Sequence, residues 1–279
     1  MEFEKSIIEN IKARYSCRSY DSKPLEEALV ERLCAYIDEM NTQTKIRARF
    51  QYITNNSNNE TPLKLGTYGM IAGATNYIIG IYTDGEENYA EFGYMFEKII
   101  LFATDMNLQT CWLGGTFNRG EFTQKCKLGE NEYIAIVCPV GIKKQKPRFF
   151  DNAVRSLVGA DKRKAFNELF FENDLSTPLD ENKAGDYKIP LEMVRLGPSA
   201  SNKQPWRIIK NDYGYDFYLN RTKAYAKGPF DMQKNDIGIA MCHFGLTAKE
   251  MGLKGQWDYK ENQKNIVDLD YISTWVIAE

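Results

Sequence analysis

The pattern of apolar and polar positions predicts two successive runs of helices and strands. Leu25, Leu29, Leu33 and Ile37 recur every four positions, which predicts a helix from Leu25 to about Met40. An Asn-rich stretch, NNSNNE, predicts a loop near residue 55. The remaining elements of the first run are helices over Glu4–Ala13 and Ala90–Met106 and strands over Phe50–Thr54, Tyr77–Tyr82 and Tyr133–Val140.

A polar region separates the two runs. From Phe149 to Asp186 helical patterns alternate with loop signals, and ENDLSTPLDENKAGD is the strongest linker candidate. We therefore predict a first half over 1–165, a linker over 166–186 and a shorter second half over 187–279. The second half has helices over Pro190–Leu196 and Asp236–Met251 and strands over Trp206–Lys210, Tyr215–Leu219 and Tyr271–Ile277.

The second run repeats features of the first. When Gly93 is aligned with Gly238, both segments show an apolar helix, a Met-x-Leu sequence at its C-terminal end and then a tryptophan. The matched pairs are Ala103 with Ala248, Met106 with Met251, Leu108 with Leu253 and Trp112 with Trp257. Tyr133-Ile134 likewise resembles Tyr271-Ile272. This recurrence predicts an internal duplication.

Composition excludes several classes of protein. A formal net charge of −2 leaves no basic excess for nucleic acid and no polybasic patch for a membrane. The longest apolar stretches fall short of the roughly 18 residues that a membrane span needs. The N-terminus, MEFEKSIIENIK, carries acids where an export signal carries bases, so we expect a cytoplasmic protein.

The scarcity of histidine narrows the chemistry further. His243 is the only histidine, and it lies in the apolar run GIAMCHFGL, where a packed core residue is expected. A Ser-His-Asp triad and a multi-histidine metal centre are therefore not expected. None of the six cysteines forms a C-x-x-C pair, which agrees with a reducing compartment. Any redox chemistry would then depend on a cofactor.

Four segments together carry a family resemblance. The first is RYSCRSY at Arg14–Tyr20, and the second is PSASNKQPW at Pro198–Trp206. The third is CWLGG at Cys111–Gly115, and the fourth runs from Gly141 to the KPR of residues 146–148. They resemble the FMN-dependent nitroreductase family, and its double-repeat, fused-dimer members above all. The resemblance implies an α+β fold with a mixed sheet flanked by helices, in two pseudo-symmetric halves.

The order of the motifs departs from that of ordinary members. There, R-x-S-x-R is followed within a few tens of residues by P-S-x-x-N-x-Q-P-W. Here the expected place holds NTQTKIRARFQYI, and the second motif lies in the second half. Family members are homodimers in which each FMN is bound by residues of both subunits. The resemblance therefore implies one FMN per chain, bound between the two halves of an internal pseudo-dimer, and leaves further dimerisation open.

The resemblance also implies a role for each candidate. Arg14, Ser16, Lys146 and Arg148 suit the FMN phosphate, because guanidinium groups bind phosphate oxygens bidentately. Arg18 suits the N1–C2=O edge of the flavin, where a cation stabilises the reduced anion. From the other half, residues 198–204 would approach the ring and the ribityl chain. The candidate cofactor-binding residues are Arg14, Tyr15, Ser16, Arg18, Gly114, Gly115, Lys146, Arg148, Pro198, Ser199, Ala200, Asn202 and Gln204.

Simpler interpretations of these residues stay open. Arg14 and Arg18 could be solvated residues after a helix, and residues 143–148 a solvated charge run. Gly114-Gly115 could be a plain turn; as part of a site, it would let a backbone N–H reach flavin N5. No catalytic side chain and no metal ligand is indicated.

The predicted function is a ping-pong oxidoreductase. NAD(P)H would reduce the flavin and leave, and a small electron acceptor such as a nitroaromatic or a quinone would then take its place. No Gly-x-Gly-x-x-Gly sequence is present, so the nicotinamide would dock at the flavin pocket. The alternatives are an FMN-binding protein without turnover, serving storage or sensing, and a purely structural fused dimer.

Overall fold

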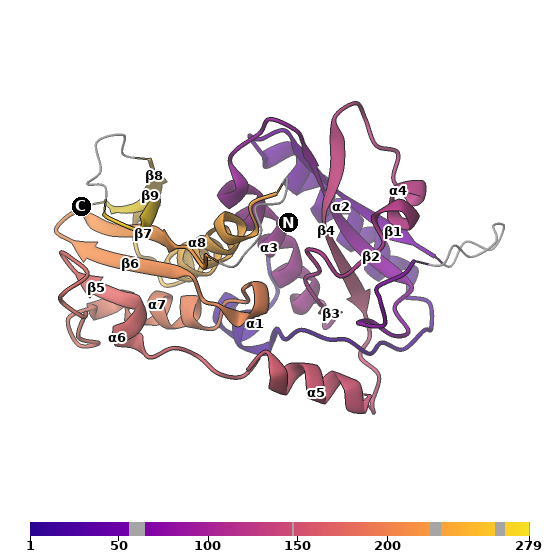
Figure 1. Ribbon diagram of the computed structural model, residues 1–279, viewed down its shortest axis with the longest axis horizontal. Coiled ribbons are helices and arrows are strands. Elements are labelled where there is room, and N and C mark those ends of the chain that lie inside the picture. The colour runs from indigo at the N-terminus through magenta and orange to yellow at the C-terminus, as the bar shows by residue number, and fades with distance from the viewer. Residues whose placement is uncertain (56–64, 147, 224–229, 260–265, 279) are drawn as a thin grey trace. The chain divides into compact units, whose positions relative to one another are not determined.

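A computed structural model describes residues 1–55, 65–146, 148–223, 230–259 and 266–278, and the chain divides into two compact units (Figure 1). The first unit comprises Met1–Lys5, Ala13–Asn88 and Lys98–Leu157. The second comprises Ser6–Lys12, Tyr89–Glu97 and Val158–Glu279. The boundary thus runs through the long helix α3, Tyr89–Asp105.

The first unit is built on a four-stranded antiparallel sheet with the order β1-β2-β4-β3. Its strands are β1 (Ala48–Thr54), β2 (Asn76–Thr83), β3 (Gln109–Thr110) and β4 (Glu132–Gly141). Its helices are α2 (Glu27–Gln43), α4 (Arg119–Lys125) and α5 (Phe149–Leu157), with the C-terminal part of α3. β2 is buried at every position before Thr83, because both faces of this central strand are covered.

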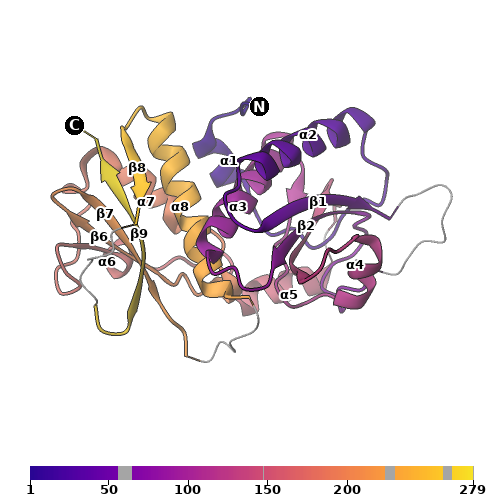
Figure 2. The ribbon, with the colours of Figure 1, turned by 90° about the horizontal axis from the view of Figure 1, so that it is seen from above.

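The apolar residues that recur every four positions in α2 explain how this helix packs. Leu33, Ile37 and Met40 are buried, and α2 lies along β1 (Figure 2). Tyr36 stacks on Phe102 of α3 with ring centroids 3.9 Å apart. The helix begins two residues later than predicted and ends at Gln43. The apolar spacing therefore predicted the helix correctly and its ends only approximately.

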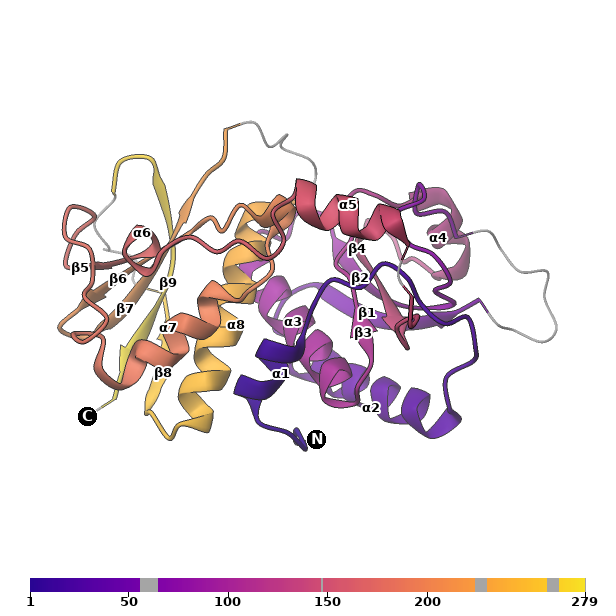
Figure 3. The same cartoon turned by 90° about the horizontal axis from the view of Figure 1, so that it is seen from below.

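The second unit contains a five-stranded mixed sheet with the order β5-β6-β7-β9-β8. Its strands are β5 (Phe170–Glu172), β6 (Trp206–Asn211), β7 (Gly214–Asn220), β8 (Gly255–Asp258) and β9 (Leu269–Ile277), and only β5 pairs in parallel. Its helices are α1 (Ile7–Ala13), α6 (Phe166–Leu169), α7 (Lys188–Arg195) and α8 (Met232–Glu250), with the N-terminal part of α3 and the 3₁₀ turns Gly185–Tyr187 and Ala200–Asn202. α7 and α8 lie side by side against the sheet (Figure 3).

The predicted α+β class is confirmed, and most predicted elements occur within a few residues of their expected ends. Four elements were not anticipated, β3, α4, β5 and β8. The segment 166–186, predicted as a linker, contains α6 and β5, and β5 pairs with β6 as an edge strand of the second sheet. The predicted loop NNSNNE lies outside the described residues except for Asn55.

Each sheet contains the same irregularity. The order β6-β7-β9-β8 repeats β1-β2-β4-β3. The register shifts after Gly80, where Ile81 faces Ile134, and in the same way after Phe217, where Tyr218 faces Tyr271. This equivalence aligns Tyr271 with Ile134, so the match of Tyr271 with Tyr133 expected from sequence is displaced by one residue.

The C-terminal caps of α3 and α8 also agree residue by residue. The backbone N–H of Leu108 donates to Ala103 O, and that of Leu253 donates to Ala248 O, each at 2.9 Å. Asn107 and Gly252, the residues before these leucines, adopt left-handed φ values of 62° and 72°. All these pairs share the 145-residue spacing of Gly93 and Gly238.

Within the second unit, α3 and α8 approach each other closely at two glycines. A methyl group on Gly93 would overlap with the Asn235 carbonyl oxygen, and one on Gly238 would overlap with the Ala90 carbonyl oxygen. Ala90 and Asn235 are themselves 145 residues apart, so each helix presents its glycine to the corresponding position of the other.

Candidate functional site

The first motif of the first unit lies beside β3. Ser16 forms a parallel bridge with Thr110, and the Cys17 N–H donates to Thr110 O at 2.9 Å. Burial raises the pKa of the Cys111 thiol, whereas the nearby positive charges of Arg18 and Arg14 act to lower it. The structure thus brings the R-x-S-x-R segment to the start of the CWLGG segment.

Arg18 retains hydrogen-bonding capacity in this position. One terminal nitrogen, Nη1, donates to Ser16 O at 3.4 Å. Its Nε is buried and has no hydrogen-bond partner among the described residues. A guanidinium group carries five N–H donors, and a buried donor without an acceptor is costly. Arg18 therefore fits the neighbourhood of a ligand that supplies acceptors.

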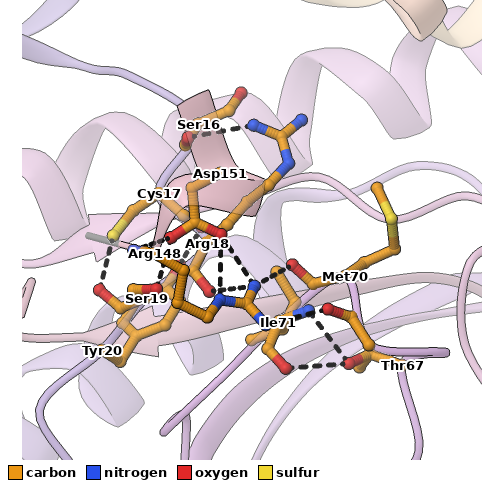
Figure 4. A network of polar contacts seen from close by, with 11 residues as sticks. Ser16, Cys17, Arg18, Ser19, Tyr20, Thr67, Met70, Ile71, Arg148 and Asp151 are labelled. Carbon is orange, nitrogen blue, oxygen red and sulfur yellow. Dashed lines mark hydrogen bonds and ion pairs between the residues drawn. The ribbon is translucent and has the colours of Figure 1, made fainter. Parts of the chain in front are cut away.

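Arg148 forms hydrogen bonds with other residues of the first unit (Figure 4). Its Nη2 donates to Asp151 Oδ1 at 2.7 Å and to Met70 O at 3.0 Å, and its Nη1 donates to Gly69 O at 3.0 Å. Asp151 also accepts a hydrogen bond from the Ser19 hydroxyl. Arg148 and Asp151 therefore fasten the start of α5 to the first motif.

The electrostatics of Asp151 agree with this role. Burial acts to raise the pKa of its carboxyl group, but the hydrogen bonds from Ser19 and Arg148 outweigh burial and hold the pKa below its usual value. Asp151 lies outside the four motifs and was not predicted. The i,i+3 spacing of Arg148 and Asp151 was the available signal, because residues at that spacing are neighbours on a helix surface.

Tyr15 and Lys146 differ in their surroundings. Tyr15 is half-buried, and the Arg155 guanidinium of α5 lies 5.3 Å from its ring centroid. Burial and a hydrogen bond with Cys17 raise the pKa of Tyr15, so its hydroxyl stays protonated at neutral pH. Lys146 is exposed and makes no polar contact with another described residue.

The Gly114-Gly115 segment follows the bridge between Leu113 and Val137. A Cβ atom placed on Gly115 would meet no heavy atom within 4 Å. Gly115 is also not among the glycines with a left-handed backbone. Among the described residues, neither packing nor backbone conformation therefore requires glycine at this exposed position, and the space beside it is open.

In the second unit, the loop at residues 197–205 has an unusual backbone. Ser201, Asn202 and Gln204 have φ values of 48°, 53° and 49°, a region that non-glycine residues seldom adopt. Hydrogen bonds hold this conformation: Ser199 Oγ accepts from the Gln204 N–H at 2.9 Å, and Ser199 O accepts from the Asn202 N–H at 2.9 Å. Pro198 and Ala200 are half-buried beside this turn.

The side chains of Asn202 and Gln204 hold a neighbouring segment. Asn202 Nδ2 donates to Gly159 O at 2.6 Å and to Lys162 O at 2.9 Å. Gln204, which is 3% exposed, accepts the Lys164 N–H at 2.9 Å through Oε1. Both amides thus bind the backbone of residues 159–164, so what this loop offers a ligand is mainly its backbone and its smaller side chains.

A buried carboxyl group supports the same loop from α8. Asp236 accepts the Ala200 N–H at 2.9 Å and is 2% exposed. Burial raises the pKa of Asp236 well above its usual value, and the negative charge of Asp231 acts in the same direction. Asp236 was not predicted to contact this loop. Its signal was an acid at the start of an otherwise apolar helical run.

His243 is a core residue, as predicted. It is fully buried, with Nδ1 2.9 Å from Met193 O and Nε2 2.9 Å from Glu97 Oε1. The six cysteines are all free. No helix within the described part of the chain combines the length and the apolar character that crossing a bilayer requires.

Comparison with known proteins identifies the family of the chain and a solved structure with a similar fold. A family model with the description "Putative TM nitroreductase" matches residues 6–248. No curated protein sequence matches the chain. A solved "putative nitroreductase" from Thermotoga maritima is similar over 99% of this chain and 95% of its own, with a TM-score of 0.58 and 17% identity. At that identity the likeness bears on the fold alone.

Two further solved structures resemble part of the chain. A nitroreductase family protein from Clostridium novyi aligns with 53% of this chain and 90% of its own, with a TM-score of 0.38 and 18% identity. A nitroreductase family protein from Clostridium difficile aligns with 56% of this chain and 92% of its own, with a TM-score of 0.37 and 16% identity.

Proposed function

The chain belongs to the nitroreductase family whose model spans residues 6–248, and from this premise we propose that it is an FMN-dependent oxidoreductase using NAD(P)H. One observation carries the proposal. Ser16 is fixed against Thr110, and Arg18 beside it keeps a buried Nε–H without a partner among the described residues. A flavin offers the acceptor atoms that this donor lacks.

Two features of the first unit fit FMN. The open space at Gly115 admits a flat ring close to the backbone. Arg14, Ser16 and Lys146 supply two cations and a hydroxyl for the phosphate. Because Arg148 is bonded to Asp151, we propose that it positions the first motif for the phosphate.

The residues of the chain would bind and orient the reactants. Bound FMN would supply the hydride transfer from NAD(P)H to a nitroaromatic or a quinone, with the donor and the acceptor bound in separate events. We propose that the Arg18 guanidinium faces the pyrimidine edge and that the backbone of Pro198, Ser199 and Ala200 contacts the same flavin. The only histidine is buried against Glu97, so we assign it no proton transfer with a substrate.

Recurrent local structure supports an internal duplication, which we infer for the two halves. Three features recur at corresponding positions of the two halves. They are the C-terminal caps of α3 and α8, the register shifts of the two sheets and the glycine contacts between α3 and α8. Because the R-x-S-x-R and P-S-x-x-N motifs each occur in one half only, we propose a single FMN per chain.

Absorption spectroscopy and steady-state turnover test the function. Purified protein incubated with FMN and desalted is expected to show the flavin bands and to oxidise NADH or NADPH in the presence of menadione or a nitrofuran. A flavin spectrum without turnover with either donor would identify a binding protein of storage or sensing type. A colourless protein would contradict FMN binding altogether.

Replacing Arg14 tests the proposed phosphate contact. Arg14→Ala is expected to weaken FMN binding by about tenfold to a hundredfold, because a charged hydrogen bond contributes about 1.5–3 kcal/mol. Fluorescence titration of flavin-free protein measures the affinity. Arg47→Ala, at a more exposed arginine of the same unit, should leave the affinity unchanged. Equal affinities for the two variants would remove Arg14 from the site.

A further inference from the structure

The only histidine of the chain joins three helices inside the second unit. Nδ1 of His243, in α8, lies 2.9 Å from Met193 O of α7, and its Nε2 lies 2.9 Å from Glu97 Oε1 of α3. Glu97 belongs to the part of α3 that is assigned to the second unit. Both His243 and Glu97 are completely buried, so bulk water does not compete for these contacts.

The contact with Met193 caps the C-terminal end of α7. Met193 lies in the last turn of this helix, where backbone carbonyl groups lose their intrahelical partners. The N–H of Gly197, four residues further on, donates to Val194 O at 2.9 Å, which leaves Met193 O to the imidazole ring. His243 therefore holds α7 at the point where the 197–205 loop begins.

The first residue of the loop packs against the same ring. A methyl group on Gly197 would lie 3.7 Å from His243 Nδ1 and 3.5 Å from Cη2 of Trp206. Gly197 is followed directly by residues 198–200, which we propose to contact the flavin. The imidazole ring thus contacts both the end of α7 and the start of the loop.

The partners of the ring determine where its protons lie. A carbonyl oxygen only accepts hydrogen bonds, so Nδ1 of His243 carries a proton. A carboxylate facing an unprotonated Nε2 would bring lone pairs into contact and leave a buried charge uncompensated. Nε2 and Glu97 Oε1 therefore share one proton. The helix dipole of α7 favours the form in which the ring carries this proton.

We propose that Glu97 and His243 are positioning residues for the 197–205 loop. Resting on the proposed function, they act on the flavin through residues 198–200 and do not touch it. Glu97 holds the ring by Nε2 and so keeps Nδ1 directed at Met193 O. The left-handed residues of the loop are costly, so the loop depends on such contacts with the rest of the unit.

Nuclear magnetic resonance of untagged, flavin-free protein tests the contact itself. Because His243 is the only histidine, its imidazole signals are assigned without ambiguity. Nδ1 should carry a proton in the parent protein and also in Glu97→Gln, whose amide can still donate to Nε2. A ring protonated on Nε2 alone would overturn the proposal.

Hydrogen exchange of the flavin-free protein tests whether the effect is local. In Glu97→Leu the backbone amides of residues 196–204 should exchange about tenfold faster or more, whereas those of β6 and β7 should keep their parent rates. Thr274→Val is the matched control, because it removes a buried hydrogen bond to Asp216 within the sheet. This control should leave the loop amides unchanged. Faster exchange throughout the second unit, or no change in the loop, would overturn the positioning role.

Flavin affinity then connects the pair to the proposed function. Glu97→Leu should weaken FMN binding about tenfold, and Glu97→Gln should restore it to within about threefold of the parent affinity. Thr274→Val should bind FMN as the parent protein does. Equal losses in Glu97→Leu and Thr274→Val would overturn the proposal, because stability alone would explain them. A parent protein that binds no FMN would contradict the proposed function, while hydrogen exchange would still decide the role of the pair in the loop.

Discussion

Asp151 shows how one carboxylate joins two distant parts of the first unit. It receives hydrogen bonds from Ser19 of the first motif and from Arg148 of the fourth. The two motifs lie more than a hundred residues apart in the sequence, and Asp151 belongs to neither. The residue that holds the candidate site together is therefore one that no motif contains.

Replacing Asp151 should destabilise the first unit in a pH-dependent way. The pKa of Asp151 is lowered in the folded protein, so its ionisation stabilises folding above the unfolded pKa of about 3.9, and this contribution is lost as the pH falls further. Asp151→Asn should reduce the free energy of unfolding by about 1–3 kcal/mol at pH 7, and by less near pH 3. Urea denaturation at both pH values measures this.

The matched control is Asp38→Asn, on the exposed face of α2. This variant should change the free energy of unfolding by less than about 0.5 kcal/mol at either pH. A loss of stability in Asp151→Asn that does not depend on pH would contradict the electrostatic account, and would point to altered packing instead.

Gly115 allows binding to be separated from folding. Because a Cβ atom at this position meets no heavy atom within 4 Å, Gly115→Ala should leave the melting temperature unchanged. If the flavin lies against this backbone, the added methyl group should weaken FMN binding by about tenfold or more, the usual consequence of overpacking. Fluorescence titration and thermal unfolding give the two values. Unchanged FMN affinity would place the ring elsewhere.

Among the elements, the 197–205 loop is held from several directions. Asp236 of α8 accepts the Ala200 N–H, and the amides of Asn202 and Gln204 bind the backbone of residues 159–164. Three non-glycine residues in left-handed conformation are costly, so the loop depends on these contacts. A short motif identified the loop, but only the packed unit fixes its shape.

The crossing of α3 and α8 depends on two glycines, which can be tested directly. Gly93→Ala and Gly238→Ala should each lower the free energy of unfolding by about 1–3 kcal/mol or more, because the methyl group would overlap a backbone carbonyl. Chemical denaturation provides the measurement. Gly120→Ala in α4, where the Cβ has ordinary contacts, should be neutral or stabilising. Equal effects at all three positions would refute the close crossing.

At the scale of the whole molecule, the two units share local architecture and differ in their candidate chemistry. Strand order, register shifts and helix caps recur. The R-x-S-x-R motif belongs to the first unit and the P-S-x-x-N motif to the second. Both observations agree with the internal duplication and the single FMN site that we propose for this chain.

This distribution predicts the amount of flavin bound. Titration of flavin-free protein with FMN should saturate at one FMN per chain, because only one complete set of motifs remains. Calorimetry or flavin fluorescence gives the stoichiometry, and amino-acid analysis gives the protein concentration. A ratio of two would show that the second site survives without its motif.

Periodicity and motif identity were properties that the sequence determined by itself. The four-residue apolar spacing of α2, the buried run of β4 and the apolar length of α8 follow from local burial, so these elements could be predicted. The candidate residues of both motifs were also readable, because each motif is a short contiguous string.

Tertiary structure alone decided which side chains remain available to a ligand. Asp151 binds both Arg148 and the distant Ser19. Asn202 and Gln204 bind the backbone of residues 159–164, and Asp236 binds the Ala200 N–H, so these contacts also join residues far apart in the chain. The pairing of β5 with β6 is likewise non-local. Such contacts depend on where the backbone returns after many residues, and no local pattern encodes that position.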